Sequence, residues 1–152
     1  MVFCISIVLN AQNTTNSIYI IMTSKTNAED GIGRFVHKKD SMDKTSSINY
    51  FVTDRSKNIH LIFDHLNYDI AKLTKVRKVR ANDQQETLTK SASFLKTITP
   101  IDLDILLPKW TREQALAFRD SMQGKKIYII DRSEIKNNQM ELVEVRCIKP
   151  TW

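Results

Sequence analysis

The segment from Lys109 to Ile148 constrains the fold more than any other part of this chain, because its helix signals are well defined. Thr111 stands where a helix N-cap belongs, Gln114 occupies the capping-box position three residues later, and Gly124 suits the C-terminal end. The apolar residues at helical spacing predict a buried stripe: Ala115, Phe118 and Met122. We therefore expect a helix that begins at the Thr111 cap and ends near Gly124.

Two strand-like segments follow this helix, at residues 126–130 and 142–148, and both are rich in Ile, Val and Tyr or Cys. The polar stretch 131–138 between them predicts an antiparallel pair. A short apolar helical element at 101–107 precedes the capped helix. This order of elements matches a winged helix-turn-helix, which is one arrangement that fits the segment.

The remaining periodicities predict a single α+β domain with N-terminal strands, central short helices and a C-terminal helix followed by the antiparallel strand pair. Apolar β-branched runs predict strands at 2–9, 18–22, 48–52 and 59–63, the last two forming a hairpin. Helical spacing predicts helices at 65–76 and 84–98, and polar composition predicts a flexible loop at 23–46. The expected organisation is an N-terminal strand pair or dispensable leader at 1–22, this loop, and a core domain at 47–152. Met22 is an alternative start.

The formal net charge of +6 favours an anionic partner, either nucleic acid or an acidic protein. No run of about 18 apolar residues predicts a transmembrane helix. We expect a cytoplasmic protein, although residues 1–11 contain an apolar run long enough for a short export signal. Cys4 and Cys147 form no metal or redox pattern, so we expect free buried thiols or, alternatively, one disulfide between the ends of the chain.

A basic run between residues 72 and 80 is the first candidate site. It contains five cations and no acid in nine residues: Lys72, Lys75, Arg77, Lys78 and Arg80. Such a cluster is typical of contacts with phosphate groups, which would hold nucleic acid without base specificity. The alternative is a solvated helix end, whose cations suit the negative end of the helix dipole.

The polar face of the capped helix is the second candidate. Arg112, Arg119 and Gln123 fall within about 60° of one another in helical projection, and such side chains can contact base edges. In a winged helix, Arg132 and Lys136 would lie on the wing and meet phosphates. An ordinary solvated face is the alternative, and the neighbouring acids Glu113 and Asp120 favour it.

Histidine and carboxylate residues gather in one further place: His60, Asp64, His65 and Asp69. They could bind a metal or act as an acid–base pair if the whole stretch were helical, but the strand-like pattern at 59–63 would separate them. Tyr50, Phe51 and Tyr128 lie in expected strands and could stack bases, although nothing in the sequence separates them from core aromatics. The sequence predicts no cofactor, because the Gly31-Ile-Gly33 stretch lacks the rest of a nucleotide-binding motif.

These patterns together predict a small, non-enzymatic nucleic-acid-binding protein that makes mainly phosphate contacts. The alternative is a protein-interaction module, such as an inhibitor, immunity-type or effector protein that docks an acidic partner. A nucleic-acid binder should gather positive charge on one continuous face. An interaction module should instead show an exposed apolar patch or an unpaired strand edge.

Overall fold

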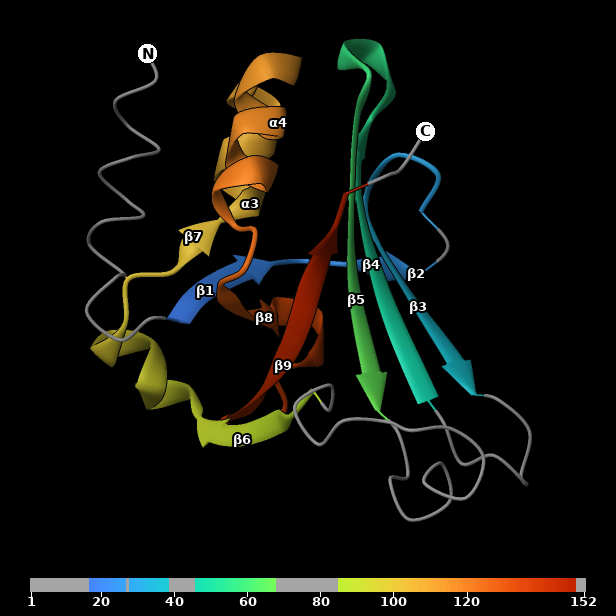
Figure 1. The fold of residues 1–152 in the computed structure, drawn as a ribbon. Coiled ribbons are helices and arrows are strands. Elements are labelled where there is room, and N and C mark those ends of the chain that lie inside the picture. Colours follow the sequence, from blue (N-terminus) through green and yellow to red (C-terminus); the bar gives the residue numbers. More distant parts are fainter. Residues whose placement is uncertain (1–16, 27, 39–45, 68–84, 150–152) are drawn as a thin grey trace.

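The computed structural model describes residues 17–26, 28–38, 46–67 and 85–149, and strands dominate it (Figure 1). In chain order the elements are β1 (Ser17–Met22), β2 (Lys25–Thr26), β3 (Gly31–Lys38), β4 (Ser46–Asp54), the 3₁₀ helix η2 (Arg55–Lys57), β5 (Ile59–Asn67), β6 (Thr87–Ser91), the 3₁₀ helix η4 (Ala92–Thr97), β7 (Ile101–Asp102), α3 (Leu103–Leu106), the 3₁₀ helix η5 (Leu107–Lys109), α4 (Arg112–Ser121), β8 (Lys126–Asp131), the 3₁₀ helix η6 (Arg132–Glu134) and β9 (Gln139–Ile148).

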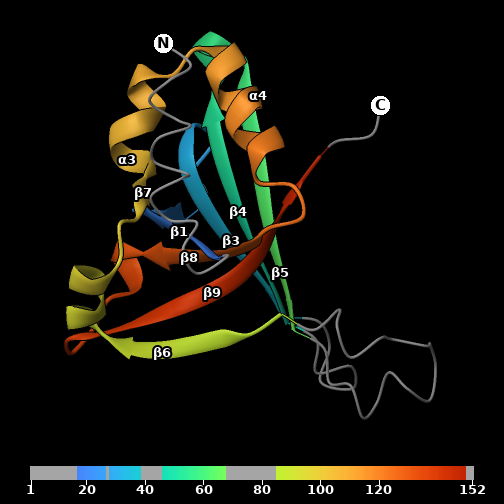
Figure 2. The same cartoon turned by 60° about the vertical axis from the view of Figure 1, so that its left-hand side comes forward.

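The strands form one mixed sheet in the order β2-β3-β4-β5-β9-β8-β1-β7, and β6 pairs with β9 beside this path. β1 runs parallel to both β7 and β8, and β2 runs parallel to β3, whereas the other pairs are antiparallel. Figures 1 and 2 show the sheet curling so that α3 and α4 lie within its concave side. The predicted α+β fold of the winged-helix kind is therefore wrong. A curled sheet with few short helices takes its place.

The curl depends on β9, which changes partners along its length. Its first half pairs with β6, and residues 146–148 pair with β5. His65 occupies the junction and is only 2% exposed. Its Nδ1 lies 2.6 Å from the carbonyl oxygen of Glu144, and its Nε2 lies 3.5 Å from the hydroxyl of Thr87. One imidazole therefore joins β5, β6 and β9 at the point where the sheet divides.

The middle of the sheet is buried on both faces, as is usual for parallel strands, and this explains the near-continuous apolar sequences of β1 and β8. The concave face packs against α3, α4 and the β3–β5 strands in the main core. The opposite face carries a second cluster around Tyr128 and Ile130, which Phe94 and Leu95 of η4 cover. Figure 2 shows β8 and β9 between these layers.

The helix predicted from Thr111 is confirmed as α4. The Thr111 hydroxyl accepts from the backbone N–H of Gln114 at 3.2 Å, and the Gln114 side chain accepts from the N–H of Thr111 at 3.0 Å. Both halves of the capping box are therefore present. Trp110 packs its ring against Phe118, with 4.8 Å between the ring centroids. The antiparallel strand pair after this helix and the β4–β5 hairpin are also confirmed.

Three other predictions differ from the structure. The helix predicted at 84–98 is wrong, because residues 87–91 pair with β9 and only residues 92–97 turn, as η4. The apolar residues that suggested helical spacing instead cover the second core cluster: Leu88, Leu95 and Ile98. Residues 31–38, expected within a flexible loop, form β3 and pair with residues 46–53 of β4. The helix expected from residue 65 does not begin there, since β5 continues through Asn67, and its remainder lies outside the described residues.

Candidate functional site

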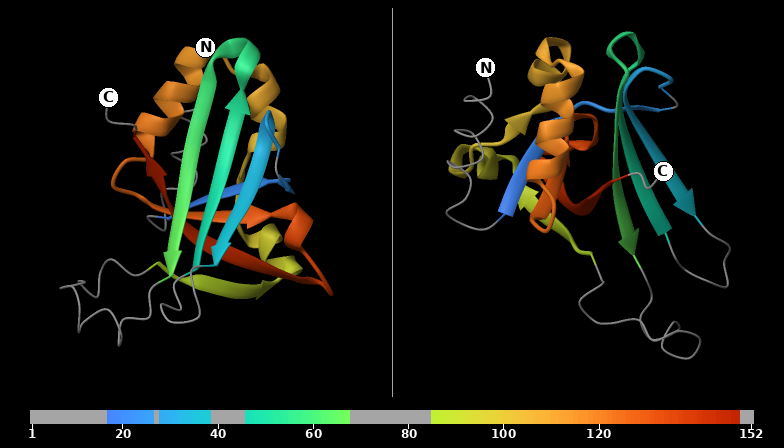
Figure 3. Two further views of the ribbon diagram at one scale, coloured as in Figure 1. Left: turned by 90° about the vertical axis from the view of Figure 1, so that its right-hand side faces the viewer. Right: turned by 45° about the horizontal axis from the view of Figure 1, so that its top comes forward.

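The outer face of the β3–β4–β5 layer carries the candidate site. Side chains alternate along these strands, so Val52 and Leu61 point into the main core while Phe51 and His60 point away from it. Among the described residues, no helix lies over this outer face. The left view of Figure 3 shows the three strands directly in front of the viewer.

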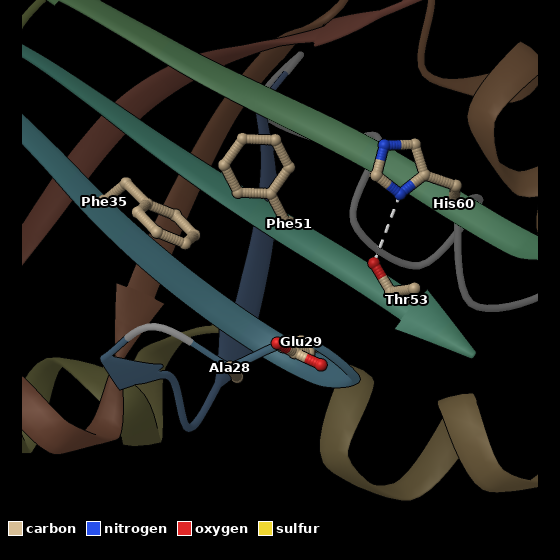
Figure 4. Close-up of a pocket in the computed structure, with 6 residues that line it drawn as sticks. All are labelled: Ala28, Glu29, Phe35, Phe51, Thr53 and His60. Atoms are coloured by element: carbon tan, nitrogen blue, oxygen red, sulfur yellow. Dashed lines mark hydrogen bonds between the residues drawn. The ribbon is translucent and has the colours of Figure 1, made fainter. Parts of the chain in front are cut away.

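Aromatic side chains from three adjacent strands line a shallow cavity of about 340 Å³ on this face. Phe35 and Phe51 meet edge to face, with 5.1 Å between centroids and 83° between planes. Phe51 and His60 are nearly parallel, with centroids 6.1 Å apart and planes 24° apart. In Figure 4 the Phe51 and His60 rings lie side by side and nearly face-on, while Phe35 is seen nearly edge-on. The first two rings form a floor, and Phe35 forms a wall.

A glycine makes room for this arrangement. Gly33 pairs with Phe51 across the β3–β4 ladder and places no side chain beside the ring. A Cβ at Gly33 would lie 3.3 Å from the carbonyl oxygen of Ala28, which is tighter than ordinary van der Waals contact. The absence of this side chain therefore lets the turn before β3 approach the sheet, and Ala28 and Glu29 of that turn complete the lining of the cavity.

The rim of the cavity is polar and mixed in charge. The Thr53 hydroxyl lies 3.2 Å from Nδ1 of His60. Asp30 accepts from the backbone N–H of Arg55 at 3.1 Å, and this bond ties the turn before β3 to the turn between β4 and β5. The tether places the Glu29 carboxylate 3.8 Å from the Arg55 guanidinium, and both side chains are largely exposed. The site therefore offers flat apolar rings beside exposed polar groups of both signs.

The predicted recognition face of α4 has other interactions in the structure. Nε of Arg119 lies 3.3 Å from the Asp120 carboxylate, and the Arg119 side chain is only 15% exposed. The side-chain amide of Gln123 donates to the carbonyl of Arg119 at 3.2 Å. Arg112 is exposed on the first turn of the helix. Two of the three predicted residues, Arg112 and Gln123, are therefore exposed to solvent, and Arg119 is largely covered.

Arg132, predicted on a wing, instead joins the carboxyl ends of parallel strands. Its guanidinium contacts Asp102 and Asp104 at 2.5 Å each. Asp104 also accepts from the backbone N–H and the hydroxyl of Thr23, at 3.0 and 2.7 Å. The hydrogen bond from Arg132 holds the pKa of Asp102 below its ordinary value. Lys136 is far more exposed, and its nearest acid, Glu134, is 4.0 Å away.

The predicted histidine–carboxylate group separates across the sheet. His60 lies on the outer face and His65 in the interior, while Asp64 pairs at 3.8 Å with Arg146. Burial raises the pKa of Asp64. Within the described ranges, no three His, Cys, Asp or Glu side chains are grouped to hold a metal ion. Asp69 and the cations at 72–80 lie outside the described residues.

The three aromatic residues that the sequence suggested for base stacking differ in their exposure. Tyr50 and Tyr128 are buried, whereas Phe51 faces outward into the cavity. Sequence reasoning missed Phe35 because it assigned the segment around it to a loop. The sequence did contain one indication of a strand here. Ile32, Gly33, Arg34 and Phe35 alternate as in a strand, and a glycine within such a pattern often marks a place where another part of the chain approaches closely. Cys147 is buried, which raises the pKa of its thiol to about 12.

Comparison with protein-family models, with characterised proteins and with solved structures finds no match to this chain. Within the part of the chain that the structure describes, the helices are too short or too polar to cross a membrane.

Proposed function

We propose that this protein binds single-stranded nucleic acid by stacking a base on the floor formed by Phe51 and His60. The observation that carries the proposal is the row of rings from Phe35 to His60, which borders an open cavity on an uncovered sheet face. Aromatic side chains on a sheet surface are a common platform for unstacked bases. The net charge of +6 supports an anionic ligand.

In this proposal, different parts of the ligand contact different parts of the protein. A base that lies flat on the floor meets the Phe35 ring with one edge, so the wall limits how far the base slides. At this end of the sheet Glu29 and Asp54 are paired with Arg55 and Lys57, so the rim offers no excess of positive charge to phosphate groups. In this proposal the nucleic-acid backbone is held elsewhere. The cations predicted to hold it are Lys72, Lys75, Arg77, Lys78 and Arg80, which lie outside the described residues.

Substitution of Phe51 by leucine tests the proposal, because leucine keeps much of the apolar area and removes the ring. Stacking contributes about 1–3 kcal/mol per base, so Phe51→Leu should weaken binding of a labelled nine-nucleotide single strand by roughly 5- to 150-fold. Fluorescence anisotropy across a salt series measures the affinity. Phe94→Leu is the matched control, since Phe94 covers the second core cluster away from the cavity. Equal affinity of Phe51→Leu and the unaltered protein would refute the stacking proposal.

Interaction with a protein partner is the second candidate, and the position of β6 favours it. Among the described strands, β6 pairs with β9 alone, and four of its five residues are exposed. A free strand edge can accept an extended peptide by adding a further strand. If no oligonucleotide binds even at low salt, capture of partners by the purified protein becomes the informative measurement.

A further inference from the structure

We infer that Glu29 gives the cavity a preference for guanine over the other bases. This inference rests on the proposed function, because it assigns base selectivity to the same cavity. The supporting observations are the fixed position of the turn that carries Glu29, its place at the edge of the ring floor, and the chemistry of a carboxylate.

The turn that carries Glu29 is tied to the turn between β4 and β5, and it lies close to β3. Asp30 accepts from the backbone N–H of Arg55, and Gly33 lets Ala28 approach the strand closely. Figure 4 shows Glu29 at the beginning of β3, below the row of rings, where it contributes to the lining of the cavity. A base on the floor therefore turns its edge, and not its face, toward this carboxylate.

The chemistry of that edge distinguishes the bases. An ionised carboxylate only accepts hydrogen bonds, through two oxygens. Guanine offers two adjacent donors on its Watson–Crick edge, the ring N1–H and the exocyclic amino group, which match the two oxygens. Adenine and cytosine offer one amino group beside a ring acceptor. In thymine and uracil a single N–H stands between two carbonyl oxygens, which repel the carboxylate.

The carboxylate is available to a ligand. Its ion pair with Arg55 spans 3.8 Å, and both side chains are mostly exposed, at 85% for Glu29 and 66% for Arg55. Exposed pairs of this kind contribute little stability, so a bidentate contact with a base can replace the pair. Such a contact typically discriminates by 1–3 kcal/mol, and we expect roughly tenfold tighter binding of guanine than of thymine.

The test uses nine-nucleotide thymidine strands in which only the central base varies. The unaltered protein should bind a central guanine about tenfold more tightly than thymine. Hypoxanthine, which lacks the amino group, should lie between them. Glu29→Gln should lose the guanine preference and still bind the all-thymine strand. Glu113→Gln, on the exposed first turn of α4, is the control that should keep the preference.

The outcomes separate this inference from the proposed function. Equal binding of all central bases, or a preference that survives Glu29→Gln, overturns the role of Glu29 and leaves stacking intact if Phe51→Leu still weakens binding. If no strand binds, or if Phe51→Leu has no effect, the proposed function fails and the role of Glu29 fails with it.

Discussion

Replacing Arg132 with methionine removes a guanidinium and keeps a side chain of similar length. In the structure this guanidinium contacts Asp102 at the end of β7 and Asp104 in α3, at 2.5 Å each. Partly exposed ion pairs contribute about 0.2–1 kcal/mol each, and the two carboxylates left behind repel each other. We therefore expect Arg132→Met to lower the free energy of unfolding by about 1–2 kcal/mol at pH 7. For a chain of this length the melting temperature should fall by roughly 2–8 °C.

The pH dependence identifies the cause of the loss. Arg132 holds the pKa of Asp102 below its ordinary value of 3.8, so the stabilisation is fully present above that pH. It disappears as the pH falls through the pKa of Asp102 in the folded protein, because the unfolded chain takes up the proton first. The stabilities of Arg132→Met and the unaltered protein should therefore converge in acid. Urea unfolding at pH 7 and at several values below 4 measures this convergence.

Lys136→Met is the control, since the Lys136 side chain is 74% exposed and its nearest acid is 4.0 Å away. It should leave the free energy of unfolding unchanged. The reasoning is refuted if Arg132→Met unfolds like the unaltered protein.

Two further predictions concern the core and the helix. Burial raises the pKa of Tyr50 to about 12, so the folded protein keeps a proton that the unfolded chain releases above pH 10. The free energy of unfolding should therefore fall between pH 10 and 12, and Tyr50→Phe should reduce that fall. Urea unfolding of both proteins at pH 8 and pH 11 measures it. An equal loss of unfolding free energy in the two proteins would contradict the burial argument. Thr111→Ala should cost about 1 kcal/mol through loss of the α4 N-cap, whereas Thr111→Ser should restore most of it, as thermal unfolding can show.

Local signals made parts of the fold predictable from the sequence. α4 was predicted because Thr111, Gln114 and the apolar spacing all lie within one helix. The β4–β5 hairpin was predictable for the same reason, since the two strands are joined by a short turn. β6 was not predictable, because residues 87–91 are stabilised by pairing with β9 some fifty residues later, with Thr87 opposite Val143. The apolar residues within 84–98 recur at helical spacing because they pack against the second core cluster, and not because they lie in one helix.

The candidate site depended even more on distant contacts. Alternation along β4 shows that Tyr50 and Phe51 face opposite sides of a strand, but it does not show which side is buried. The buried side is the one that packs against residues of α3, α4 and β9 in the main core. Glu29 lies in a turn without regular structure, and its position depends on the bond between Asp30 and Arg55. The packing that buries Tyr50 and the bond between Asp30 and Arg55 both join residues far apart in the sequence. Neither can be predicted from the residues next to Phe51 or Glu29.

The two phenylalanines on the outer face are both placed by contacts around Gly33. An uncovered face of an antiparallel sheet ordinarily carries polar residues. Phe51 stands opposite Gly33 across the β3–β4 ladder. Phe35 stands opposite Asn49, and Cε2 of its ring lies 3.4 Å from the position that a Cβ at Gly33 would take. An aromatic ring that packs over a glycine stabilises a sheet without any ligand, and the two rings also meet edge to face. Packing around Gly33 therefore contributes to the placement of both rings, and the proposed stacking of a base rests on the open cavity that they line with His60.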